Sequence, residues 1–330
     1  MRKILSILLC VAMALSALTL VSCNKPANDP APLKLGLGVY SVATKATNAD
    51  GETNGKAEAV ITVAAVLVDA DGKIVKCVID AAQNEVNYTS AGLAVAKDSF
   101  KTKGEQGSNY GMVAYGGATK EWFEQADAFC AQVVGKTVAE VKAMVATNGK
   151  GNDAIINAGC TIEITEFVKA VEAAIANAAP SNATAESTLK LGVYTVLDGS
   201  DATAEKNGTS KLETTIFAAA VDADKKIVAA TSDCVEVKFT FDQTGASTYD
   251  TTKAIVSKRA QGDSYGMKAY GNATKEWYEQ ADAFCAACIG KTAGDINALM
   301  NAENKGVESL QTAGCTITIN GFVGAASKIG

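Results

Sequence analysis

Residues 106–137, QGSNYGMVAYGGATKEWFEQADAFCAQVVGKT, return at residues 261–292 as QGDSYGMKAYGNATKEWYEQADAFCAACIGKT. The two stretches are identical at 24 of 32 positions, with a constant offset of 155. Shorter matches extend the likeness on both sides, for example Val68–Asp71 with Val221–Asp224 and Ala158–Ile162 with Ala313–Ile317. A unit of about 150 residues has the size of a domain rather than of a solenoid repeat. The sequence therefore predicts a tandem duplication.

The duplication divides the chain. We expect a first repeat domain at residues 33–178, a linker at 179–187 and a second repeat domain at 188–330. The seam around the linker, Ala176–Ser187, is rich in Ala, Asn and Ser and holds one proline. That composition suits the end of a helix followed by a short connection.

Each repeat begins with strand patterns. Apolar and β-branched residues fill Ala59–Val68 and Lys73–Ile79, and the Asp-Gly pair at 71–72 between them is a strong hairpin signal. In the second copy Lys225 replaces that glycine, which weakens the hairpin prediction there. A third strand is expected at Glu85–Thr89, matched by Glu236–Thr240.

Helix patterns follow the strands. From about Lys120, apolar residues recur at helical spacing as far as Val134, and Gly135 is expected to end that helix. Thr137 with Glu140 is a capping-box pattern, echoed by Thr292 with Asp295. A short strand at Cys160–Ile164 and a closing helix at Thr165–Ala178 complete the unit. Strands that precede helices predict an α+β fold: two tandem copies of an antiparallel sheet with helices packed on one side.

The first residues have the features of a lipoprotein signal peptide, predicted at residues 1–22. Arg2 and Lys3 precede an apolar run of about 16 residues, which is shorter than the roughly 20 that a membrane-spanning helix needs. Leu20-Val21-Ser22-Cys23 reads as a lipobox, so Cys23 is the expected lipidation site and residues 23–32 a polar tether. An ordinary signal peptide with Cys23 free is the alternative. The prediction is export by the secretory pathway and lipid anchoring to the outer face of the bacterial cell membrane.

Composition excludes several functions. Removal of the signal peptide changes the formal net charge from -6 to -8, and an acidic chain offers no electrostatic footprint for nucleic acid. The chain has no histidine, which excludes Ser-His-Asp and Cys-His mechanisms. We therefore expect no catalytic residues, no metal site and no enzyme activity. The expected partners are the membrane, through the lipid, and an unidentified small molecule or surface protein.

The repeated loop is the best candidate for a binding surface, because aromatic rings beside glycines can form a flat platform. The alternative is that these side chains only fix the loop to the helix that follows. The candidate binding residues are Tyr110, Gly111, Met112, Tyr115 and Trp122, with Tyr265, Gly266, Met267, Tyr270 and Trp277 in the second copy.

Seven cysteines remain after the signal peptide and Cys23 are set aside. Cys130 and Cys160 are 30 residues apart, as are Cys285 and Cys315, which suggests one disulfide in each repeat. Buried thiols are the alternative. Cys285 and Cys288 form a CxxC motif in the middle of a predicted helix.

Two acidic residues lie on each predicted hairpin turn, Asp69 and Asp71 in one copy and Asp222 and Asp224 in the other. They could bind calcium, but such residues are more often turn formers, and no glutamate completes an EF-hand pattern.

The runs DADGKIVKCVID (residues 69–80) and DADKKIVAATSD (222–233) resemble the FMN-binding-domain lipoproteins of bacterial surfaces. In that family a flavin transferase attaches FMN to the last residue of a Dxx(S/T)GA(S/T) motif. The closest run here is Thr244-Gly245-Ala246-Ser247, with Asp242 one residue away from the family position, and the first copy has no such motif. The resemblance implies that Thr244 and Ser247 would be cofactor-binding residues, with Ser247 as the FMN acceptor.

The repeated YGM…KEW block resembles a group of duplicated exported proteins of Gram-positive bacteria. Taken together, the sequence favours a membrane-anchored extracytoplasmic lipoprotein with two FMN-binding-like repeats that binds a ligand or partner. An extracellular FMN-carrying electron-transfer lipoprotein is the alternative, and a redox protein that uses Cys285 and Cys288 is the third hypothesis.

Overall fold

The computed structural model describes residues 31–330, so the predicted signal peptide and Cys23 lie outside the described residues. The first repeat contains three long strands and a set of helices. Its elements are β1 (Lys34–Thr47), β2 (Gly55–Val68), β3 (Ile74–Tyr88), β4 (Ala94–Val95), α1 (Lys103–Gln106), η1 (Gly107–Tyr110), α2 (Trp122–Val133), α3 (Val138–Lys142), α4 (Asp153–Ala158) and α5 (Thr165–Ala176).

The second repeat has the same order of long elements. After β5 (Ala179–Pro180) come β6 (Thr188–Ser200), β7 (Gly208–Val221), β8 (Ile227–Phe241), α6 (Lys258–Gln261), η2 (Gly262–Tyr265), α7 (Met267–Gly271), α8 (Trp277–Cys288), η3 (Ala293–Leu299), α9 (Glu308–Thr312) and α10 (Asn320–Ser327). α5 ends before the expected linker at residues 179–187, and β6 begins directly after it.

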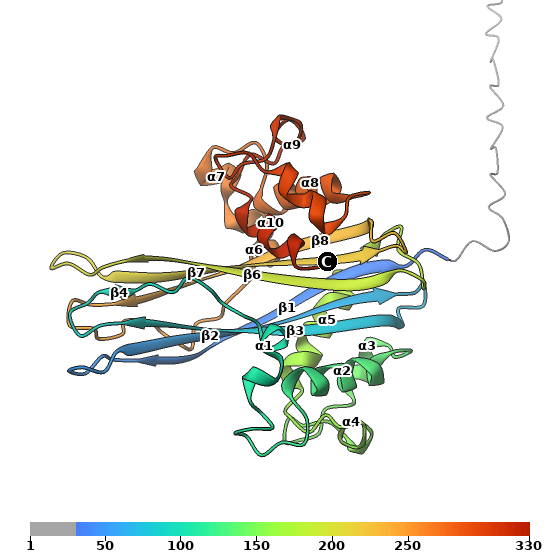
Figure 1. Ribbon diagram of the computed structural model, residues 1–330, viewed down its shortest axis with the longest axis horizontal. Coiled ribbons are helices and arrows are strands. Elements are labelled where there is room, and N and C mark those ends of the chain that lie inside the picture. The colour runs from blue at the N-terminus through green and yellow to red at the C-terminus, as the bar shows by residue number, and fades with distance from the viewer. Residues whose placement is uncertain (1–30) are drawn as a thin grey trace, which may run out of the picture. The chain divides into compact units, whose positions relative to one another are not determined.

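The strands form two antiparallel sheets, ordered β4-β3-β2-β1-β5 and β6-β7-β8. The sheets lie against each other, and the helices of each repeat cover the outer face of its own sheet (Figure 1). The predicted α+β class with helices on one side of each sheet is confirmed.

Burial on both faces explains the strand sequences. The inner faces of both sheets form one apolar core, which includes Leu37, Ile61, Ile216 and Phe239. The outer face of the first sheet forms a second core with α2 and α5, and α8 and α10 form a third with the other sheet. A strand buried on both faces has a continuous apolar run rather than alternation, as Ala59–Val68 has. The two repeats therefore share a core, and residues 31–330 form one compact unit.

The hairpin turns are set by aspartate side chains. Asp69 Oδ1 accepts hydrogen bonds from the backbone N–H groups of Asp71 and Lys73, at 3.0 and 2.9 Å. Asp222 repeats this arrangement, and Lys225 adopts a positive φ of 60° in place of the glycine. The second hairpin is thus as regular as the first, because the aspartate supplies most of the turn's hydrogen bonding.

Two strand predictions need correction. Lys73–Ile79 and Glu85–Thr89 belong to one continuous strand, β3, rather than to two. Cys160–Ile164 is not a strand, because the side chain of Gln125 accepts the N–H groups of Thr161 and Ile162 that a strand would use for pairing.

The repeats meet through matched hydrogen bonds at the turns that follow β3 and β8. Ala49 N donates to Gly245 O and Ala202 N donates to Gly92 O, both at 2.8 Å. Likewise, Ser247 N donates to Asn48 Oδ1 and Ala94 N donates to Asp201 Oδ1, both at 2.9 Å. Because each contact has a counterpart 153 residues away, the repeats are related by an approximate twofold axis. The equivalent rings of Tyr88 and Phe241 stack on each other, with centroids 4.5 Å apart.

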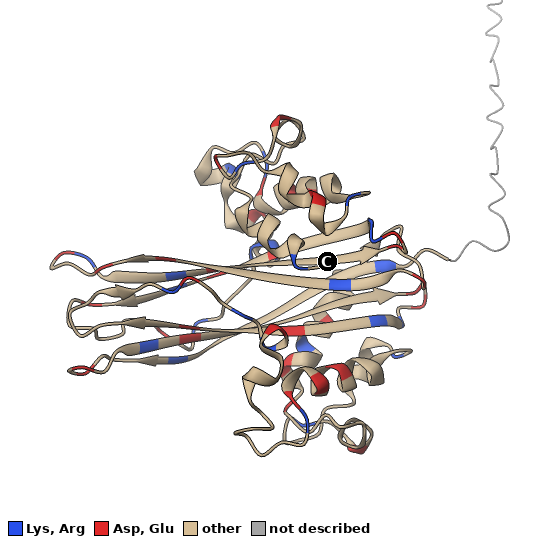
Figure 2. Cartoon of the chain, viewed as in Figure 1, with Lys and Arg blue, Asp and Glu red and all other residues tan. Residues whose placement is uncertain are grey.

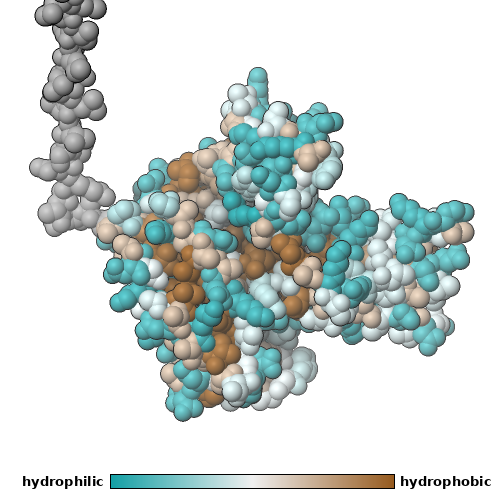
Figure 3. Space-filling view, turned by 180° about the vertical axis from the view of Figure 1, so that it is seen from behind, coloured by the Kyte–Doolittle hydropathy of each residue, from teal (hydrophilic) through white to brown (hydrophobic). Residues whose placement is uncertain are grey.

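Charged residues of both signs are mixed over the surface, whereas apolar residues are concentrated on part of it. Basic and acidic residues are interspersed along the strands and helices (Figure 2). On the rear face, apolar residues gather near the helical layers, whereas the far strand ends are mostly hydrophilic (Figure 3). None of the helices within residues 31–330 is long and apolar enough to span a bilayer.

Candidate functional site

The repeated loop is fastened to the helix that follows by two glutamates. The buried Glu121 accepts hydrogen bonds from the backbone N–H groups of Met112 and Val113, at 2.9 and 3.3 Å. Glu124 in turn accepts from the N–H of Glu121 and completes a capping box at the start of α2. Glu276 and Glu279 make the same bonds in the second repeat. These four glutamates of the block therefore have structural roles.

Gln125 has a similar bridging role. Its Oε1 accepts from the N–H groups of Thr161 and Ile162, and its Nε2 donates to Lys120 O at 3.0 Å. Gln280 repeats these contacts in the second repeat. Lys120 Nζ donates to Ala158 O at 3.1 Å and so ties the start of α2 to the end of α4. These hydrogen bonds explain why the repeated block extends into the helix.

The tryptophans belong mainly to the cores. Trp122 is 4% exposed and meets Phe167 edge to face, with ring centroids 5.6 Å apart. Trp277 stacks on Phe322 at 5.5 Å. Trp277 therefore fixes the loop to the helix that follows, as the alternative interpretation expects. Trp122 also lines a cavity.

Two tyrosines of the loop project into solvent. Tyr115 is 92% exposed and Tyr270 is 89% exposed. Each ring lies against a glycine in the left-handed conformation, Gly111 or Gly266, where a Cβ would come within 2.6 Å of the ring. Glycine is thus required at both positions, and both tyrosine rings stay open to contact.

The structure adds a lysine that the sequence analysis missed. Lys103 Nζ lies 5.1 Å from the ring centroid of Tyr110 and 5.6 Å from that of Trp122. Lys258 has the same position in the second repeat, 5.3 Å from Tyr265 and 5.9 Å from Trp277. Such distances are those of cation–π contacts. The offset of 155 carries Lys103 onto Lys258, and this was the one signal in the sequence that could have identified the pair.

A buried aspartate positions each lysine-bearing helix. Asp80 accepts from the backbone N–H groups of Ala81 and Gly104, at 2.7 and 3.0 Å, and Asp233 does the same for Cys234 and Arg259. Burial raises the pKa of Asp80, and hydrogen bonds from Thr102 and from the two backbone groups oppose that rise. Burial raises the pKa of Asp233 in the same way.

Two cavities border the loop of the first repeat. One of about 370 Å³ lies over Trp122 and is lined by Lys103, Tyr110, Met112 and Glu166 among others. A second of about 540 Å³ is more open and lies between Gln83, Tyr110 and Tyr115. Tyr110 and Met112 line both, and the Tyr110 hydroxyl donates to Gln83 Oε1 at 2.9 Å. All five candidate residues of the first repeat thus line one cavity or the other.

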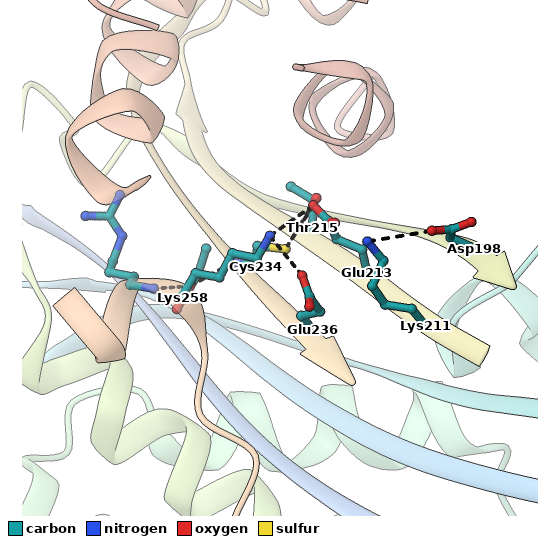
Figure 4. Close-up of polar contacts among 9 residues, drawn as sticks. Asp198, Lys211, Glu213, Thr215, Cys234, Glu236 and Lys258 are labelled. Carbon is teal, nitrogen blue, oxygen red and sulfur yellow. Dashed lines mark hydrogen bonds and ion pairs between the residues drawn. The ribbon is translucent and has the colours of Figure 1, made fainter. Parts of the chain in front are cut away.

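In the second repeat, two carboxylates lie beside the equivalent lysine (Figure 4). Lys258 Nζ lies 3.2 Å from Glu213 Oε1 and 3.5 Å from Glu236 Oε2. Burial lowers the pKa of Lys258, but the neighbouring Cys234, Glu213 and Tyr265 outweigh burial and raise it. The second lysine is therefore held as a charged ammonium by groups of the protein itself.

The cysteine predictions are corrected by the structure. All seven cysteines within residues 31–330 are free thiols, and the thiol neighbour of Cys130 is Cys77 rather than Cys160. The Cys285–Cys315 pair is also unbonded. The alternative of buried thiols therefore holds for the predicted pairs.

The CxxC cysteines are buried in α8. Burial raises the pKa of Cys288 to about 12 and that of Cys285 well above its ordinary value. A protonated thiol is a poor nucleophile, so this environment opposes redox chemistry at the motif.

The aspartates on the hairpin turns hydrogen-bond to the backbone of those turns. Asp69 and Asp222 accept hydrogen bonds within their own turns, and the described part of the chain holds no group of three or more Cys, Asp or Glu residues placed to bind a metal ion.

The residues around Ser247, the serine expected to accept FMN, form a turn at the seam between the repeats. Asp242 Oδ1 accepts from the N–H groups of Thr244 and Ala246, which makes this segment a tight turn. A Cβ at the buried Gly245 would lie 2.4 Å from Thr89 O of the other repeat. Ser247 Oγ accepts from Tyr249 N, and Ser247 N donates to Asn48. This segment is thus packed into the seam between the repeats.

Comparison of the chain with family models, with curated proteins and with solved structures found no match.

Proposed function

We propose that this protein is an exported, lipid-anchored binding protein that holds a small molecule beside the loop of its first repeat. The observation that carries the proposal is the 370 Å³ cavity, whose wall combines apolar and aromatic surface with a few polar groups. Trp122, Phe167 and Met112 supply the apolar part, while Lys103 and Glu166 supply opposite charges. This combination is typical of small-molecule sites.

The anchored location rests on the sequence alone. The signal peptide pattern of residues 1–22 and the lipobox that ends at Cys23 support export and lipid attachment. An anchored protein with a concave site and no catalytic constellation would serve to capture its ligand at the cell surface. Electron transfer through FMN is the weaker candidate, because Ser247 lies within a packed turn.

The experiment is a ligand-observed NMR screen of small acids, amines and neutral compounds against the mature chain. Met112→Trp would fill the cavity, and Met267→Trp makes the matched change in the second repeat. We expect compounds that bind the wild type to lose at least about tenfold in affinity for Met112→Trp and to keep their affinity for Met267→Trp. Equal loss in both variants, no loss in Met112→Trp, or no compound bound by the wild type would contradict the proposal.

A further inference from the structure

Among the differences between the two repeats is a cross-strand pair beside Lys258. In the first sheet Val60 of β2 lies opposite Gln83 of β3. At the equivalent register of the second sheet, Glu213 of β7 lies opposite Glu236 of β8. The neighbouring pair, Thr62 opposite Ala81 and Thr215 opposite Cys234, fixes the correspondence. One apolar and one neutral residue thus stand where the other repeat has two carboxylates.

The second repeat shows what a lysine in this setting requires. The side chain of Lys258 is only 6% exposed, and both glutamates come within ion-pair distance of it. Glu213 and Glu236 converge on this ammonium from neighbouring strands (Figure 4). A desolvated charge is costly unless a partner of opposite charge compensates it. Here the protein supplies that partner.

The first repeat has the lysine and the aromatic rings without the carboxylates. Within residues 31–330, no carboxylate oxygen comes within 4.0 Å of Lys103 Nζ. Gln83 cannot substitute, because its amide donates to Glu58 Oε2 at 2.9 Å and accepts from the Tyr110 hydroxyl. The ammonium instead lines the 370 Å³ cavity.

We propose that the first-repeat cavity binds a small organic monocarboxylate, whose carboxylate pairs with Lys103. This inference rests on the proposed function, since it names the ligand class of the same cavity. The apolar body of the ligand lies against Met112 and Phe167.

Two acids that line the cavity limit the ligand to one carboxylate. Glu163 and Glu166 both line it, and Glu166 Oε2 accepts a hydrogen bond from the Thr62 hydroxyl at 3.0 Å. A second carboxylate on the ligand would meet these acids and be repelled. Monocarboxylates are therefore preferred over dicarboxylates.

The test uses isothermal titration calorimetry of the mature chain with benzoate, phenylacetate and 3-phenylpropionate. Controls are 3-phenylpropionamide, which is neutral, and phenylsuccinate, which carries a second carboxylate. We expect at least one monocarboxylate to bind with one site per chain, and its amide and dicarboxylate analogues to bind at least about tenfold more weakly, since a charge-assisted hydrogen bond is lost or opposed. No binding of any monocarboxylate, or equal binding of acid and amide, would overturn the inference.

Two variants test whether the ammonium of Lys103 pairs with the carboxylate of the ligand. Lys103→Met removes the ammonium. Gln83→Glu places a carboxylate at the position of Glu236 and at the same time removes the amide that donates to Glu58 Oε2. Each should weaken the monocarboxylate about 10- to 100-fold, whereas Glu236→Gln, the reciprocal change in the second repeat, should leave the first site unchanged. Circular dichroism confirms folding, and Gln83→Glu keeps the test decisive if Lys103→Met fails to fold. Unchanged affinity in Gln83→Glu and Lys103→Met contradicts the inference.

The outcomes separate this inference from the proposed function. If screened compounds lose affinity in Met112→Trp but do not distinguish acid from amide, the cavity is a binding site and only the carboxylate assignment fails. If Met112→Trp changes no binding, the proposed function fails as well.

Discussion

A single side chain often decides whether a segment pairs as a strand, and Gln125 is the clearest case here. From the sequence, Cys160–Ile164 looked like a strand because its residues are apolar and β-branched. The carboxamide of Gln125 captures its N–H groups from 36 residues away. Such long-range hydrogen bonds leave no periodicity in the sequence.

Asp80 makes stability depend on pH in a direction that follows from its burial. Its pKa is raised above the ordinary value of 3.8, chiefly by desolvation, so the folded state binds its proton more tightly than the unfolded state does. The contribution of Asp80 to stability is greatest below that value and falls as the pH rises through the folded-state pKa. We expect Asp80→Asn to gain stability relative to the wild type as the pH rises above the ordinary carboxyl pKa of 3.8.

Urea unfolding at several pH values measures this difference. Asp98→Asn, at an exposed position, is the control for the loss of an aspartate charge. A gap between Asp80→Asn and the wild type that stays constant with pH would contradict the assignment.

The candidate site was predicted from the sequence only in part. Three residues of the repeated block, Tyr110, Met112 and Trp122, line the cavity, and their role in binding stays a prediction. Lys103 was missed because it lies outside the block. That Gln83 and Glu236 occupy equivalent positions can be recognised only from the strand register of the two sheets.

Among the elements, the strands were predicted more accurately than the turns that join the repeats. The DADG pattern correctly gave the β2–β3 hairpin, because local turn chemistry is written in adjacent residues. The Thr244–Ser247 turn, in contrast, makes hydrogen bonds with residues almost 200 positions away, such as the 199 between Ser247 and Asn48, and no local pattern reports such contacts.

The reciprocal turns provide a matched pair of glycine substitutions. Gly92 has φ of 69°, and a Cβ there would lie 2.7 Å from Gln243 Cα of the other repeat. Gly51 has a similar φ of 57° but no atom within 4 Å of its Cβ position. We expect Gly51→Ala to cost about 1 kcal/mol of unfolding free energy from backbone strain, and Gly92→Ala about 2–4 kcal/mol from strain plus overpacking.

Chemical denaturation of both variants checks this prediction. The difference between them isolates the contact between the repeats, because the backbone strain is common to both. Equal destabilisation by Gly51→Ala and Gly92→Ala would mean that the turn at Gly92 is not packed tightly against the turn at Gln243.

At the scale of the whole molecule, a shared core replaces two independent ones. The sequence predicted two similar units but could not reveal that their sheets pack face to face. Apolar residues on both faces of β2 are compatible with burial by any neighbour. The stacked Tyr88 and Phe241 show that the neighbour is the other repeat.

A shared core predicts a single unfolding event. Calorimetry of the mature chain should give one transition with equal calorimetric and van't Hoff enthalpies. Tyr88→Ala, at a fully buried position between the sheets, should shift the whole transition downwards through a loss of about 3 kcal/mol. Two separate transitions, or a shift confined to one of them, would show that the repeats unfold independently.

The short connection between α5 and β6 has a consequence for assembly. Two separate copies of one repeat would have to find each other by diffusion, and their sandwich would come apart on dilution. Within one chain, the connection of residues 177–187 gives each sheet a high effective concentration of its partner. The pairing of the two sheets therefore does not depend on protein concentration. The two repeats can also diverge in sequence, because each sheet pairs with the other repeat of its own chain rather than with an identical sheet of another molecule.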